Sequence, residues 1–153
     1  MATDIIIGRL RESDRARWRE LWRLYLAFYE TELPEAAYKL LWQRLLGGGG
    51  PVWGFGARRG EPGAPLIGSP HYLFHDHGWS ARPVCYLQDL YVDAAARGAG
   101  VGRALIGQVA AAARERDCLR LYWTTKEDNA TARRLYDRIA RFNGFIRYDY
   151  ALE

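Results

Sequence analysis

Cysteine, lysine and long apolar runs are all scarce in this 153-residue sequence, which has two cysteines and two lysines. Cys85 and Cys118 have neither CxxC spacing nor a neighbouring cysteine or histidine for a zinc site, so we expect two buried, reduced thiols. The N-terminus lacks a basic region followed by a long apolar segment, and the uncharged apolar stretches are only strand-sized. We therefore expect no signal peptide, no membrane partner and a cytoplasmic location.

Positive charge is carried almost entirely by arginine, because only Lys39 and Lys126 are lysines among the 22 basic residues. The formal net charge is +4, and the isoelectric point is about 9.2. Binding to nucleic acid needs a clustered basic stripe rather than a high isoelectric point alone. We therefore do not expect a nucleic acid partner.

Three histidines, at positions 71, 75 and 77, share one parity along an expected strand. Side chains spaced along an extended face project over about 20 Å and do not converge on one ion. We therefore expect no metal site.

Apolar residues make up 49% of the chain and aromatic residues 14%, which predicts a single globular α/β domain over residues 1–153. Pro70 indicates that one strand begins at a sheet edge or contains a bulge. Helical spacing of aromatic residues predicts core positions rather than a ligand site. We expect strands at 5–10, 52–59, 66–75, 84–92, 118–125 and 145–152. We expect one helix from 13 or 14 to 29, a second at 35–46, a third from the glycine segment to 116, and a fourth at 129–142.

The glycine-rich stretch ARGAGVGRALIG at 96–107 follows the strand expected at 84–92 and opens a helix. Free backbone N–H groups and the helix dipole at such a turn face an anion, which predicts a phosphate-binding turn. Arg103 stands where the GxGxxG pattern of dinucleotide folds has its third glycine, and no GK[ST] follows. A tight turn that binds nothing is the alternative interpretation.

Three motifs in order resemble those of the GNAT family of N-acetyltransferases. RGAGVG at 97–102 matches the family signature R/QxxGxG/A, NATARRLY at 129–136 is similar to its NxxAxxLY helix, and Gly144-Phe145 precedes the last expected strand. The resemblance covers nearly the whole chain. It implies a mixed, mostly antiparallel sheet flanked by about four helices, in which the strands at 84–92 and 118–125 splay apart to hold acetyl-CoA.

The same resemblance implies how acetyl-CoA is bound. The pantetheine arm would lie along the strand at 84–92, and the pyrophosphate would sit on the amides of the glycine turn. Solvated arginines in that turn, and an asparagine at 129 that only caps its helix, remain open as alternatives. The implied cofactor-binding residues are Leu90, Tyr91, Val92, Arg97, Gly98, Ala99, Gly100, Val101, Gly102, Arg103, Asn129 and Arg133.

For catalysis, the resemblance implies Tyr136 as general acid, with a core tyrosine as the alternative. Related proteins read YLED where this chain has YLQD, so Gln88, which cannot accept a proton, replaces a glutamate. Asp89 is the adjacent carboxylate and a candidate base or amine anchor. Strand alternation points the side chains of Gln88 and Asp89 to opposite faces, so one of them faces away from the cofactor. A structural role for Asp89 stays open.

YLQDLYV at 86–92 looks most like the polyamine, small-amine and histone-type branch of the family. The implied substrate residues are Tyr29, Glu30, Glu32 and Gln88, since a segment rich in glutamate could receive a cationic amine. A solvated helix end stays open as the alternative for the glutamates. The expected activity is transfer of an acetyl group from acetyl-CoA to a primary amine by direct attack in a ternary complex, in a homodimer. The alternatives are a non-catalytic acyl-CoA-binding module and an acetyltransferase acting on aminoacyl-tRNA.

Overall fold

The computed structural model describes residues 4–153, and the chain divides into two units, one ending at Trp123 and the other spanning Thr124–Glu153. The first unit contains a sheet with the strand order β1-β3-β4-β5-β6, and β2 also pairs with β4. Only β5 and β6 run parallel, so the predicted mixed, mostly antiparallel sheet is confirmed. The strands are β1 (Ile5–Gly8), β2 (Val52–Gly54), β3 (Gly56–Arg59), β4 (Leu66–His77), β5 (Ser80–Val92) and β6 (Arg120–Tyr122).

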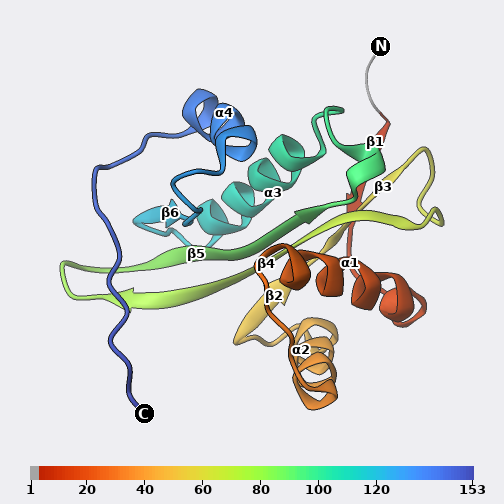
Figure 1. Ribbon diagram of the computed structural model, residues 1–153, viewed down its shortest axis with the longest axis horizontal. Helices are drawn as coiled ribbons and strands as arrows, with labels where there is room; N and C mark the ends of the chain where they lie inside the picture. The colour runs from red at the N-terminus through yellow and green to blue at the C-terminus, as the bar shows by residue number, and fades with distance from the viewer. Residues whose placement is uncertain (1–3) are drawn as a thin grey trace. The chain divides into compact units, whose positions relative to one another are not determined.

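Helices cover both faces of this sheet. Helices α1 (Arg15–Phe28) and α2 (Glu35–Gly47) lie on one face, and α3 (Val101–Glu115) lies on the other (Figure 1). The second unit contains α4 (Ala130–Ile139). Among the residues that the structure describes, no helix combines the length and apolarity needed to cross a membrane.

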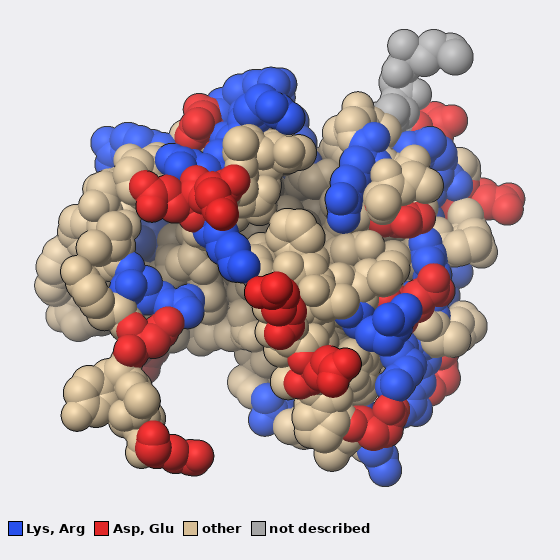
Figure 2. Space-filling view, in the orientation of Figure 1, with Lys and Arg blue, Asp and Glu red and all other residues tan. Residues whose placement is uncertain are grey.

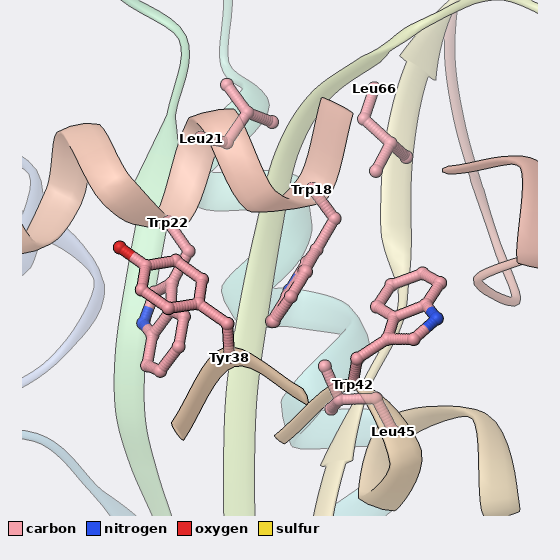
Figure 3. Close-up of a cluster of buried hydrophobic side chains, with 7 residues drawn as sticks. All are labelled: Trp18, Leu21, Trp22, Tyr38, Trp42, Leu45 and Leu66. Carbon is pink, nitrogen blue, oxygen red and sulfur yellow. The ribbon is translucent and has the colours of Figure 1, made fainter. Parts of the chain in front are cut away.

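An aromatic cluster forms the core between α1, α2 and the sheet (Figure 3). The Trp18 ring lies 5.4 Å from that of Trp22 and 4.9 Å from that of Trp42, measured between centroids. The prediction that the aromatic residues of α1 belong to the core is confirmed for Trp18 and Trp22. Phe28, at the end of the helix, is 58% exposed. The cluster consists of Trp18, Leu21, Trp22, Tyr38, Trp42, Leu45 and Leu66.

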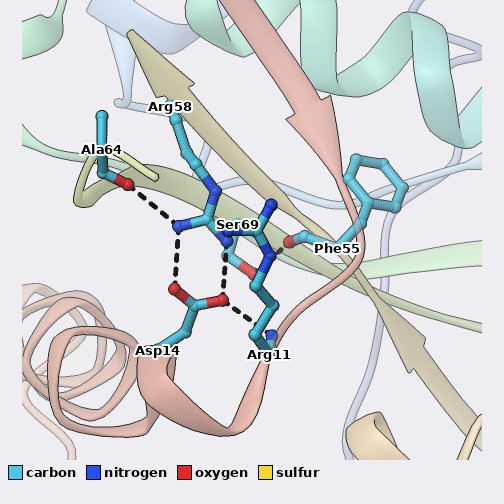
Figure 4. Close-up of polar contacts among 6 residues, drawn as sticks. All are labelled: Arg11, Asp14, Phe55, Arg58, Ala64 and Ser69. Atoms are coloured by element: carbon cyan, nitrogen blue, oxygen red, sulfur yellow. Dashed lines mark hydrogen bonds and ion pairs between the residues drawn. The ribbon is translucent and has the colours of Figure 1, made fainter. Parts of the chain in front are cut away.

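A buried ion pair fixes the start of α1 to the sheet (Figure 4). The Asp14 carboxylate accepts hydrogen bonds from Arg58 Nη1 at 2.8 Å, Arg58 Nη2 at 2.6 Å and the backbone N–H of Arg11 at 2.7 Å. Burial raises the pKa of Asp14, but the bonds from Arg58 and Arg11 outweigh it, and the pKa lies below its usual value. This pair positions the helix whose later turns face β5.

Replacing Arg58 by methionine is expected to lower the free energy of unfolding at pH 7 by about 3–5 kcal/mol, because Asp14 is left buried without its cation. The folded-state pKa of Asp14 is lowered, so its stabilising contribution is present above pH 3.8 and is lost as the pH falls further. Urea unfolding at pH 7 and pH 3 measures both effects. The exposed pair of Arg147 and Asp149 supplies the control, since Arg147→Met should cost less than about 1 kcal/mol. Equal losses in the two variants would contradict the prediction.

The strand prediction needs three corrections. The expected strand 52–59 is two strands interrupted at Phe55, and the strand expected at 118–125 is limited to the three residues of β6. The strand expected at 145–152 does not form, and residues 140–153 have no regular secondary structure. Within the described residues, no strand pairs with this segment. The bulge predicted in the strand that contains Pro70 is confirmed at Ile67, the extra residue of β4 between Leu66 and Gly68 where it pairs with β3. The irregularity beside His71 instead inserts its extra residue, Gln88, in β5.

Both cysteines are free thiols, as predicted. Cys85 is buried, and its burial raises its pKa to about 12. Cys118 is only half-buried, so the prediction of two buried thiols is wrong for this residue. It lies just before the short strand β6 rather than inside a longer one.

Candidate functional site

The C-terminal half of β5 has an open edge. Parallel pairing with β6 covers only Val84–Tyr86, and within residues 4–153 no strand pairs with that edge of β5 from Leu87 onward. On its other edge β5 continues along β4 as far as Val92. Leu90, Tyr91 and Val92 therefore lie where the two parallel strands have parted, as predicted. An extended ligand could hydrogen-bond to such an edge.

The glycine turn connects this edge to α3. Gly98 and Gly100 both have φ of +83°, a conformation that side chains with a Cβ rarely adopt. A Cβ at either position would meet no other protein atom within 4 Å, so the backbone, and not crowding, explains these glycines.

The amides at the start of α3 suit an anion. The first helical hydrogen bond runs from Ala104 N–H to Gly100 C=O at 3.0 Å, so the amides of Val101, Gly102 and Arg103 precede it. N–H groups in the first turn of a helix lack intrahelical partners and carry the positive end of the helix dipole. This open, glycine-lined turn fits the diphosphate of an acyl-CoA.

Arg97 ties the turn back to β5. Its Nε donates to the Val92 carbonyl at 3.2 Å, and its guanidinium carbon lies 5.8 Å from the centroid of the Tyr91 ring. Arg97 and Arg103 are both exposed, and Arg103 lies on the first turn of α3. Of the two predicted arginines, Arg97 is thus held at the junction of strand and turn.

Gln88 and Asp89 differ in burial, but regular strand alternation is interrupted here, because Gln88 is the extra residue of a bulge in β5 between Leu87 and Asp89. Gln88 is exposed, whereas Asp89 is buried on the face covered by α1. Asp89 Oδ2 lies 2.9 Å from Nδ1 of His71, the residue directly opposite on β4. From the sequence, His71 was considered only as a metal ligand, and its pairing with Asp89 was not predicted.

A cavity of about 10 Å³ adjoins the Asp89 carboxylate. This volume suits one water-sized group. The indole N–H of Trp22 is buried and has no hydrogen-bond partner among the described residues. Asp89 and Trp22 thus line the same small space. The residues around it are Trp18, Leu21, Trp22, Ser69, His71, Asp89 and Tyr91.

The end of α1 brings aromatic side chains toward β5. The ring of Tyr25 makes edge-to-face contacts with Tyr29 at 5.0 Å and with Tyr91 at 6.3 Å between centroids. Its hydroxyl donates to the Gln88 carbonyl at 3.5 Å. Tyr29 and Gln88, both predicted substrate residues, are thus connected through Tyr25, which the sequence analysis had not selected.

Acidic atoms lie over the connection between α1 and α2 (Figure 2). Glu30 ends the helical region with φ of +54°, and both Glu30 and Glu32 are exposed. Glu35 forms a bidentate ion pair with Arg19, including an Nη2 to Oε2 distance of 2.7 Å. Within the described residues, neither Glu30 nor Glu32 has such a pair.

The second unit carries the remaining predicted residues. Asn129 caps α4, since its Oδ1 accepts from Ala132 N–H at 3.4 Å while its Nδ2 donates to Thr125 Oγ1 at 3.1 Å. The capping role considered for Asn129 is therefore confirmed. Arg133 donates to the Glu127 carbonyl at 2.7 Å, and Tyr136 is half-buried on the same helix. Seven residues separate Asn129 from Tyr136, about two helical turns, so both lie on similar sides of α4.

The three histidines of β4 are separated. His71 contacts Asp89, His75 Nε2 lies 3.1 Å from the Tyr122 hydroxyl, and His77 accepts from the backbone N–H of Trp79. Across residues 4–153, no three His, Cys, Asp or Glu side chains are grouped so as to hold a metal ion.

A sheet whose parallel strands part beside a glycine turn, with a buried carboxylate nearby, defines a class of proteins that bind an acyl-CoA and an acceptor. The sequence profile of the Acetyltransferase (GNAT) family matches residues 18–142. The chain belongs to this family, whose enzymes use acetyl-CoA, and it is an N-acetyltransferase that acts on an amine.

Named relatives support the same assignment. The chain is 35% identical over 136 residues to the D-amino-acid N-acetyltransferase HPA3 of Saccharomyces cerevisiae, a match covering 89% of this chain and 84% of the relative. It is 36% identical over 78 residues to the thialysine N-epsilon-acetyltransferase of Bos taurus, covering 50% and 45%. The fold is similar to that of the aminoglycoside N-acetyltransferase AAC(6')-Iy in complex with CoA, with a TM-score of 0.81, 17% identity, and coverage of 99% and 97%.

Proposed function

We propose that this enzyme transfers the acetyl group of acetyl-CoA to the primary amine of an amino acid or polyamine-like small molecule, or of a peptide lysine, within a ternary complex. The observation that carries the proposal is the buried Asp89 carboxylate beside the open edge of β5. The named relatives act on D-amino acids and on thialysine, which are both amines. The family match covers residues 18–142, which supports a single acetyltransferase domain over residues 1–153.

Acetyl-CoA supplies an activated thioester when it is bound. The backbone of Leu90, Tyr91 and Val92 would hold the pantetheine arm, since that edge of β5 is open. The residues from Arg97 to Arg103 would hold the diphosphate at the start of α3. Asn129 and Arg133 would add contacts from the second unit.

The acceptor amine must lose a proton before it attacks. A primary amine with a pKa of about 10.4 is neutral in roughly one molecule in 2,500 at pH 7, a cost of about 4.6 kcal/mol. Asp89 would receive this proton, which the amide of Gln88 cannot do, or it would anchor the ammonium group. Tyr136 would donate to the departing thiolate. Tyr29, Glu30, Glu32 and the exposed Gln88 would border the acceptor.

Release of free CoA from acetyl-CoA in the presence of different amines tests this function. The panel should contain D- and L-amino acids, lysine analogues, polyamines, aminoglycosides and lysine peptides. Amine-dependent release supports the proposal, and acetyl-CoA binding without release from any amine would indicate a binding module instead. Salt-sensitive retention of tRNA would favour the aminoacyl-tRNA alternative.

We also propose that the enzyme works as a homodimer in the cytoplasm. Two free thiols suit a reducing compartment. Light scattering of the purified chain tests the dimer, and a monomer at assay concentration would contradict it.

Replacing Glu30 and Glu32 together by glutamine is expected to raise KM for diamines about three- to tenfold, since each exposed charge contributes up to about 1 kcal/mol. KM for a monoamine should change less, because it lacks the second positive charge. Steady-state kinetics with one diamine and one monoamine measures the difference. The double variant Glu61→Gln/Glu115→Gln makes the same charge change at other exposed positions and should leave both KM values unchanged. Equal effects of the first variant on both amines would mean that Glu30 and Glu32 only face solvent.

A further inference from the structure

A hydrogen-bonded chain connects α1, β4 and β5 beneath the candidate site. Trp18 Nε1 donates to His71 Nε2 at 2.9 Å, and His71 Nδ1 lies 2.9 Å from Asp89 Oδ2. The three residues are 1%, 2% and 9% exposed, respectively. Water therefore has little access to these contacts, and each partner depends on the next.

The chemistry of the indole group determines the tautomer of His71. An indole N–H can only donate, so His71 Nε2 must be the unprotonated acceptor. The single ring proton then lies on Nδ1 and is donated to Asp89. A second proton, on Nε2, would point at the indole N–H and leave two buried donors facing each other. Trp18 thus keeps His71 in the neutral Nδ1–H form.

This arrangement leaves Asp89 as an oriented anion. One carboxylate oxygen is held by a neutral donor rather than by an imidazolium, and among the described residues no lysine or arginine forms an ion pair with Asp89. Asp89 and Trp22 line the same cavity, and the buried indole N–H of Trp22 has no hydrogen-bond partner among those residues. The other ionisable groups nearby are Tyr91, which lines the cavity, and Tyr38, whose ring contacts Trp18.

We propose that His71 is a positioning residue for Asp89 and that Trp18 fixes its tautomer. His71 holds the carboxylate toward the cavity, in the charged form that can receive the proton or the charge of the acceptor amine. This inference rests on the proposed function of Asp89, and it adds two residues that act only through Asp89.

Two substitutions at one position separate positioning from packing. His71→Leu removes the donor, whereas the side-chain amide of His71→Asn can place an N–H near the position of Nδ1. We expect His71→Leu to lower kcat about 10- to 100-fold with unchanged acetyl-CoA binding, and His71→Asn to regain most of that loss. His77→Leu, a control on the same strand, should leave kcat unchanged. Equal losses in the Leu and Asn variants, or no loss in either, would overturn the proposal.

Nitrogen NMR tests the tautomer without any substitution at the site. The chain has three histidines, so ¹⁵N-histidine labelling gives a spectrum simple enough to assign with single variants. At neutral pH we expect His71 to be protonated on Nδ1 alone. In Trp18→Phe, which keeps an aromatic ring in the core, we expect the Nε2 signal of His71 to shift and kcat to fall. A wild-type His71 protonated on Nε2 would overturn the inference even if the Leu variant failed to fold.

Asp89→Asn distinguishes this inference from the proposed function. If Asp89→Asn retains full activity, the proposed role of Asp89 fails, and with it the role of His71. If Asp89→Asn loses activity while both His71 variants remain as active as the wild type, only the positioning role is overturned.

Discussion

Glutamate in place of Gly100 is expected to abolish stabilisation of the enzyme by acetyl-CoA. Gly100 is the residue before the first turn of α3, so the new carboxylate would lie at the position proposed for the diphosphate. A ligand at about one hundred times its dissociation constant stabilises the folded state by about 2.7 kcal/mol, which corresponds to about 5–10 °C in Tm for a chain of this size. Thermal unfolding with and without CoA should show this shift in the wild type and none in the variant.

The fold should survive this substitution, because a Cβ at Gly100 would meet no protein atom within 4 Å. The φ of +83° still adds strain to any residue with a side chain, so a matched control is needed. Gly60 has φ of +87° and equally open surroundings between β3 and β4. Gly60→Glu carries the same strain and charge, and it should keep the full response to CoA. An undiminished response in Gly100→Glu would refute a diphosphate site at this turn.

Phenylalanine in place of Tyr136 is expected to lower kcat about 10- to 1,000-fold with little change in CoA binding, a loss of roughly 1.4–4 kcal/mol in transition-state stabilisation. Full proton transfer from an ordinary phenol to an ordinary thiolate is uphill by about 2 kcal/mol. A hydrogen bond to the departing sulfur avoids that cost and is also lost in the variant. Both forms of the mechanism therefore predict the same kinetic signature.

A tyrosine that only packs would behave differently. Tyr136 is half-buried on α4, so a purely structural hydroxyl predicts a lower Tm with kcat preserved. Turnover, Tm and CoA binding measured on the one variant decide between the two roles. Tyr148→Phe, on the exposed C-terminal segment, serves as the control and should change none of them.

Local patterns predicted much of the candidate site. The cap at Asn129 follows from its residue type before a helix. The requirement for glycine at positions 98 and 100 was likewise visible as a turn between strand and helix. Each of these inferences depends only on residues close together in the chain.

Pairings between distant residues were not predictable in this way. His71 meets Asp89 because β4 and β5 pair in one particular register, and that register is altered by the bulge at Gln88. Arg58 and Asp14 are 44 residues apart in sequence, and they meet only when the start of α1 lies against the sheet. Both contacts require the sheet and its covering helix to be assembled first.

The sequence by itself determined the family, the order of most elements and the location of the turn proposed for the diphosphate, because motif spacing and hydrophobic period are short-range properties. The tertiary structure alone decided which carboxylate acquires a partner and which strand-like segment becomes a strand. Residues 145–152 alternate like a strand, but a strand also needs a partner edge for its backbone N–H and C=O groups. Asp89, likewise, is an ordinary strand residue until α1 and β4 supply Trp18 and His71.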